Sequence, residues 1–125
     1  MPSADEIRET LVHYVERLSA GDADTIADLY TEDGSAEDPV GGPVNEGREA
    51  VRAFYAAMSG VLTAEISGPI CVAGNTGVMP LIACLQLPGK PARWLDAIDL
   101  VEFDDSGLIR SLRAYWNPAE MRDAR

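Results

Sequence analysis

The segment WLDAIDLVEF, residues 94–103, decides the fold because its side chains alternate as in a β-strand with one buried face. Asp96 falls on the mixed face with Trp94 and Glu102. The other face carries four apolar residues and one carboxylic acid: Leu95, Ala97, Asp99, Val101 and Phe103. The strand therefore places Asp99 on the face that should be buried.

Strand-like runs dominate the chain after Gly60. Four are centred on 61–67, 69–74, 77–87 and 92–103, a fifth covers 108–117, and turn-rich segments separate them. Pro80 indicates an edge position or a bulge in its run.

Helical patterns occupy the first half of the chain. A capping box, Ser3 with Glu6, opens a helix that ends near Gly21, and further helices are predicted over 23–30 and 48–58. Residues 31–35 read as a turn, 35–40 as a short extended segment and 41–47 as a loop. The pattern predicts one α+β domain over residues 1–125: a curved, mostly antiparallel sheet, with three N-terminal helices packed on it to form a cone-shaped barrel. The mouth of such a cone could hold a ligand.

Composition narrows the class of partner. The 125 residues are 46% hydrophobic and 25% charged, as in ordinary globular domains. Ten basic residues stand against 21 acidic ones, for a net charge of −11, and Lys and Arg form no cluster. This composition argues against a nucleic acid or an anionic membrane as partner and favours a neutral, apolar ligand.

No secretory signal opens the sequence, and the longest apolar run, residues 78–85, is too short to span a bilayer. We therefore expect a cytoplasmic protein. Cys71 and Cys84 lie in apolar runs, so we expect two buried thiols and no disulfide.

Asp99 is the first candidate for a catalytic residue. An unpaired carboxyl in apolar surroundings has a raised pKa, because burial disfavours its charged form, and it can remain a neutral O–H donor. Two structural explanations stay open: an ion pair with a buried Arg, or a wrong assignment of the strand face.

Tyr14 lies at the centre of the first helix's apolar stripe, as a core aromatic residue would. Tyr30 and Tyr55 also fall on the predicted inward faces of their helices. Three inward phenols can hydrogen-bond to one another and polarise the outermost hydroxyl.

Asp38 is the third candidate. Ala36, Asp38 and Val40 share one face of the extended segment, so alternation selects Asp38 rather than Glu37 as the inward acid. The alternative is a turn residue, because Asp before Pro often begins a turn. Metal-ligand spacings, a phosphate-binding loop, GxSxG and CxxC are missing from the sequence, so we expect neither metal nor cofactor. Carboxylates and phenols suit proton transfer.

Taken together, the motifs resemble the bacterial ketosteroid Δ5-isomerases almost from end to end. The similar segments are HYVERLSAGD (13–22), AEDPVG (36–41), REAVRAFYAAM (48–58) and WLDAIDLVEFDDSGLIRSLRAYW (94–116). The resemblance implies that Asp38 is the general base, Tyr14 the oxyanion-hole phenol and Asp99 a protonated acid. Ketosteroid isomerases are a known example of a carboxylic acid kept neutral by an apolar site. Tyr30 and Tyr55 match phenols that, in one branch of the family, hydrogen-bond to the oxyanion-hole Tyr.

The resemblance also implies a reaction, a substrate and an assembly. Asp38 would move a proton from C4 to C6 of a 3-oxo-Δ5 steroid, without a cofactor, while Tyr14 and Asp99 donate hydrogen bonds to the C3 oxygen. A homodimer formed through the outer sheet face is expected. Leu81 replaces a bulkier aromatic residue of one relative, which bears on the preferred steroid. The expected substrate-binding residues are Tyr30, Phe54, Tyr55, Met79, Leu81, Val101 and Trp116.

Two other hypotheses about the function remain. One is a different enzyme on this scaffold, polyketide cyclase-like or epoxide hydrolase-like, that uses both acids; Arg110 or Arg113 within reach of Asp99 would favour it. The other is a non-catalytic ligand-binding or dimerisation module, similar to nuclear transport factor 2, in which Asp38 is only a turn residue.

Overall fold

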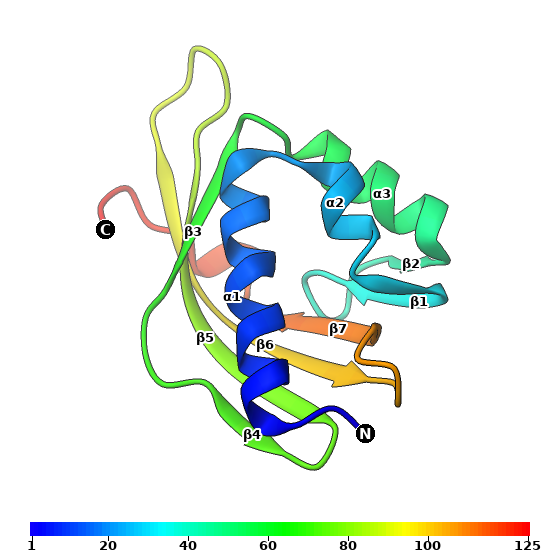
Figure 1. Ribbon diagram of the computed structural model, residues 1–125. Helices are drawn as coiled ribbons and strands as arrows, with labels where there is room; N and C mark the ends of the chain where they lie inside the picture. Colours follow the sequence, from blue (N-terminus) through cyan, green and yellow to red (C-terminus); the bar gives the residue numbers. More distant parts are fainter.

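The computed structural model describes residues 1–125 and contains three helices on one face of a curved seven-stranded sheet (Figure 1). The α-helices are α1 (Ala4–Ala20), α2 (Ala23–Ala27) and α3 (Arg48–Ala57), and a short 3-10 helix, η1, covers Pro118–Glu120 after the last strand. The strands are β1 (Tyr30–Glu37), β2 (Val44–Glu46), β3 (Leu62–Ile66), β4 (Cys71–Ala73), β5 (Thr76–Leu85), β6 (Arg93–Phe103) and β7 (Ile109–Tyr115). The predicted α+β class and the mostly antiparallel sheet are confirmed.

The sheet has the order β2-β1-β7-β6-β5-β3, with β4 paired to the other end of β5. All pairs are antiparallel except β1 with β7. The long strands β5 and β6 bend around α1, which lies across the concave face (Figure 1). This curvature leaves room for a cavity between the helices and the sheet.

Helix α1 forms as its sequence predicts. Ser3 and Glu6 make both hydrogen bonds of the capping box, and Gly21 ends the helix with a φ of 71°. Its apolar stripe is buried against the sheet. A Cβ atom at Gly77 would lie 2.7 Å from Leu11 Cδ1, so the glycine lets α1 pack directly on β5.

Three local predictions were wrong. Tyr30 begins β1 instead of ending α2, and residues 31–35 belong to the same strand. The parallel pairing of β1 with β7 holds this turn-like sequence extended, with an irregular register between Tyr30 and Ser35. The predicted loop 41–47 contains β2, which pairs with the end of β1.

Pro80 lies in an interior strand, so the predicted edge position was wrong. On one side it faces Ile98 of β6; on the other, the partner of β5 changes there from β3 to β4. A residue without an N–H group fits this break in the ladder.

The cysteine prediction was partly wrong. Cys71 and Cys84 are free, but Cys71 is exposed on β4 and Cys84 is half-buried. No helix of the chain is both long and apolar enough to cross a bilayer.

Candidate active site

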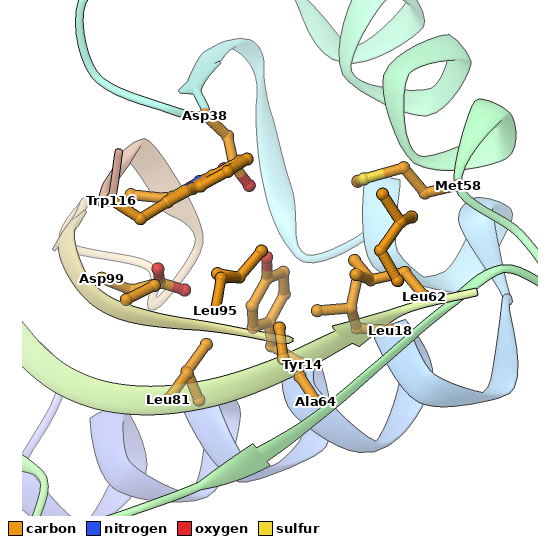
Figure 2. Close-up of a pocket in the computed structure, with 14 residues that line it drawn as sticks. Tyr14, Leu18, Asp38, Met58, Leu62, Ala64, Leu81, Leu95, Asp99 and Trp116 are labelled. Carbon is orange, nitrogen blue, oxygen red and sulfur yellow. The ribbon is translucent and has the colours of Figure 1, made fainter. Parts of the chain in front are cut away.

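A cavity of about 220 Å³ lies between α1 and the concave face of the sheet (Figure 2). Asp38, Asp99 and Trp116 lie toward one end, and the apolar side chains of Leu18, Met58 and Leu62 toward the other (Figure 2). Twelve of its 14 lining residues are hydrophobic: Tyr14, Leu18, Met58, Leu62, Ala64, Leu81, Ala83, Leu85, Leu95, Ala97, Ala114 and Trp116, with Asp38 and Asp99 as the remainder. The cavity therefore suits an apolar ligand with a polar group at one end.

Asp99 is the only buried residue among the Asp, Glu, Lys, Arg and His residues of the chain, with 2% of its surface exposed. It lies on β6 between Met79 of β5 and Ala114 of β7, on the face that alternation assigned to it. Burial, and then the negative charge of Asp38, raise its pKa well above the ordinary value of an aspartate. Arg113, a possible ionic partner, pairs with Glu37 instead. Burial and the Asp38 charge both favour the neutral, O–H-donating form of the Asp99 carboxyl.

Three phenols form a hydrogen-bonded chain that ends at the cavity. The Tyr55 hydroxyl lies 2.6 Å from that of Tyr30 and 3.1 Å from that of Tyr14. Only Tyr14 lines the cavity. Burial raises the pKa of all three phenols well above the usual range, so each remains a neutral donor. In such a chain, the inner phenols can stabilise negative charge that develops against the Tyr14 hydroxyl.

Asp38 follows the last residue of β1 and enters the cavity from the opposite side to Tyr14 (Figure 2). Its Oδ1 accepts a hydrogen bond of 2.6 Å from Nε1 of Trp116. Burial raises the pKa of Asp38, and the Trp116 hydrogen bond opposes that shift. Glu37 points away from the cavity, as alternation predicts, and pairs with Arg113.

The structure brings Tyr14, Asp38 and Asp99 to one cavity, together with two of the expected substrate-binding residues, Leu81 and Trp116. Five others do not line it. Met79 and Val101 are fully buried in the core. Phe54 packs its ring 5.2 Å from that of Tyr55, and Tyr30 and Tyr55 lie behind Tyr14 in the phenol chain.

Nine lining residues were not anticipated as ligand contacts. The sequence contained a signal for four of them, because they lie on the same strand faces as site residues that were predicted. Leu95 and Ala97 lie on the face of Asp99, and Ala83 and Leu85 on the face of Leu81. The others are Leu18, Met58, Leu62, Ala64 and Ala114.

The sequence profile of the SnoaL-like domain matches residues 11–112 of the chain. Steroid Delta-isomerase from Nocardioides simplex is 32% identical over 117 residues, which cover 93% of this chain and 94% of that protein. The chain therefore belongs to the SnoaL-like family of the nuclear transport factor 2-like superfamily, and within it to the ketosteroid isomerase family that its motifs resemble.

Two further relatives carry other activities. Epoxide hydrolase LasB from Streptomyces lasalocidi is 28% identical over 121 residues, 93% of this chain and 43% of that longer protein. The structure of the epoxide hydrolase/cyclase-like enzyme SalBIII, which has a role in pyran ring formation in the polyether salinomycin, superimposes with a TM-score of 0.88 and 26% identity. That match covers 99% of this chain and 100% of SalBIII. The relatives are enzymes, and they perform more than one reaction on this fold.

Proposed function

We propose that the protein is a steroid Delta5-isomerase, which converts 3-oxo-Δ5 steroids into conjugated 3-oxo-Δ4 steroids. One observation carries this proposal: the carboxyl groups of Asp38 and Asp99 and the phenol of Tyr14 line the same apolar cavity. Asp38 is the base, and Tyr14 and Asp99 are the donors.

In the proposed reaction, Asp38 takes the proton from C4 of the steroid, and the electrons of that C–H bond move into a dienolate. The same carboxyl group then returns the proton at C6, and the C3 carbonyl re-forms. A base that must also release its proton needs a modest pKa. The Trp116 hydrogen bond to Asp38 supports this role, because it limits the rise in pKa that burial causes.

Tyr14 and Asp99 would donate hydrogen bonds to the C3 oxygen as it gains negative charge. Donors that are already fixed in a dry cavity need no reorganisation in the transition state, and losing one such donor costs about 3–4 kcal/mol. Both groups can donate because burial keeps them protonated. The aliphatic wall would bind the steroid rings at roughly 25 cal/mol per Å² of buried apolar surface.

The direct test is the ultraviolet absorbance of the conjugated enone after adding androst-5-ene-3,17-dione. We expect turnover by the wild-type protein and almost none by Asp38→Asn. A protein that binds the steroid but forms no enone is not a steroid isomerase, and this proposal is then wrong.

Epoxide opening is the second candidate, favoured by the similarity to LasB and SalBIII. A neutral acid such as Asp99 can protonate an epoxide oxygen while Asp38 activates a hydroxyl nucleophile. However, Arg113 is engaged by Glu37 rather than directed at Asp99. Incubation with a hydroxy-epoxide substrate, analysed for ring-opened or cyclised product, separates this activity from isomerisation.

We also propose that two copies associate through the outer face of the sheet. Ile98 and Tyr115, neighbours on β6 and β7, expose 50% and 40% of their surface there. Analytical ultracentrifugation of the wild-type protein and of Ile98→Asp measures the oligomeric state. We expect a dimeric wild type and a monomeric variant, and a monomeric wild type contradicts the proposal.

A further inference from the structure

We propose that Glu37 and Arg113 are positioning residues that hold the turn carrying Asp38. This inference deepens the proposed isomerase function and rests on it for its kinetic consequences. Its structural part concerns only how the 38–43 turn is fastened.

Asp38 itself lies just beyond the β1 ladder, so the sheet does not fix it directly. The turn after it is held by three hydrogen bonds from backbone N–H groups. Two go to backbone oxygens: Val40 N to Ala114 O at 2.8 Å, and Gly42 N to Pro39 O at 3.0 Å. The third goes from Gly41 N to Oε2 of Glu37, at 3.0 Å. Glu37 therefore supplies the only side-chain contact among them, and it closes the turn around Asp38.

Arg113 fixes the carboxylate that makes this contact. Its Nε donates to Glu37 Oε1 at 3.1 Å, and the two residues are direct register partners across the β1–β7 ladder. The guanidinium also lies 5.4 Å from the centre of the Tyr115 ring. Glu37 is 18% exposed, and the Gly41 N–H and then Arg113 lower its pKa. A charged Glu37, with one oxygen for each partner, thus links β7 to the turn.

The position of Asp38 matters because one carboxyl group must reach two carbon atoms of the substrate. Displacing a reacting group by about 1 Å can cost about a hundred-fold in rate. Loosening the turn should therefore lower kcat. It should leave KM and the affinity for a phenolic ligand unchanged, because Tyr14 and Asp99 lie on other elements.

The test measures three variants: Glu37→Gln, Arg113→Gln and the double variant that combines these two changes. A fourth variant, Glu49→Gln, is measured beside them. The last is a matched control: it removes an exposed Arg-paired carboxylate on α3, away from the cavity. We expect kcat to fall roughly ten- to a hundred-fold in each single variant. We expect the kcat of the double variant to equal that of Glu37→Gln, because Arg113 acts only through the Glu37 carboxylate. An unchanged kcat in a folded Glu37→Gln protein overturns the proposal, as does an equal loss of kcat and phenol affinity, which indicates general disruption.

A second readout does not need isomerase activity. The chain has two tryptophans, and the indole N–H of Trp116 donates to Asp38. In nitrogen-15 NMR spectra, we expect the Trp116 indole signal to shift or broaden in Glu37→Gln and Arg113→Gln, while that of Trp94 stays in place as an internal reference. Both signals should be unchanged in Glu49→Gln. If the wild-type protein shows no isomerase activity, the proposed function fails but this measurement still decides the positioning role, and an unmoved Trp116 signal overturns it.

Discussion

Replacing Asp99 by Asn should change how stability depends on pH. In the unfolded chain, the Asp99 carboxyl ionises at an ordinary aspartate pKa of about 4. In the folded protein its pKa is raised by burial and by the charge of Asp38. Between these two values, unfolding releases one proton, so the free energy of unfolding falls as pH rises, by about 1.4 kcal/mol per pH unit.

Asn has nearly the same shape as a neutral Asp and cannot ionise. The Asp99→Asn variant therefore lacks this loss. Relative to wild type, it should gain about 3 kcal/mol over each two pH units in that window, and the gain should level off above the folded-state pKa of Asp99. Taking the difference between the two proteins cancels the contributions of titrating groups that do not interact with Asp99.

The assay is urea unfolding of both proteins at a series of pH values from about 4 to about 8. Asp96→Asn is the matched control, because it removes the exposed acid of the same strand and its ion pair with Arg122. An exposed pair contributes at most about 1 kcal/mol, so this variant should keep the wild-type slope. A pH-independent difference between Asp99→Asn and wild type would show that Asp99 is already charged in the folded protein, and would refute the reasoning.

Three further predictions concern the cavity. Asp38→Asn should abolish nearly all enone formation. Its steroid affinity, measured by fluorescence titration, should stay within about three-fold of wild type, because the apolar wall supplies most of the binding free energy. Retained turnover would show that Asp38 is not the base. Tyr14→Phe should lower kcat roughly a hundred- to a thousand-fold, measured by the same enone assay, and a loss under about three-fold would remove Tyr14 from the oxyanion hole. Ala97→Leu should fill part of the cavity and weaken steroid binding in calorimetry, with Ile98→Leu on the outer face as its control; equal affinities would place the ligand elsewhere.

Local patterns were sufficient to predict most of the secondary structure. The alternation along residues 94–103 identified the buried face of β6 and Asp99 on it, because side-chain direction in a strand depends only on neighbours in sequence. The capping box and apolar stripe of α1 likewise identified Tyr14 as inward-facing. Tyr30 was placed on the wrong element, since its strand depends on pairing with β7, nearly 80 residues away.

The extent of the cavity could not be predicted from the same patterns. Alternation tells which face of β6 is buried, but it does not tell where along the strand the helices cease to cover it. Val101 lies in the closed core, whereas Leu95 and Ala97, on the same face, line the cavity. The contact between Glu37 and Arg113 joins residues 76 positions apart and has no local signature.

The central claim is that Tyr14 and a neutral Asp99 donate to one oxygen atom of the ligand. Proton NMR of the protein bound to estradiol, whose phenol resembles the dienolate, tests it most directly. We predict two strongly deshielded hydroxyl protons at the ligand oxygen, one lost in Tyr14→Phe and the other in Asp99→Asn. A spectrum that Asp99→Asn leaves unchanged would contradict the claim.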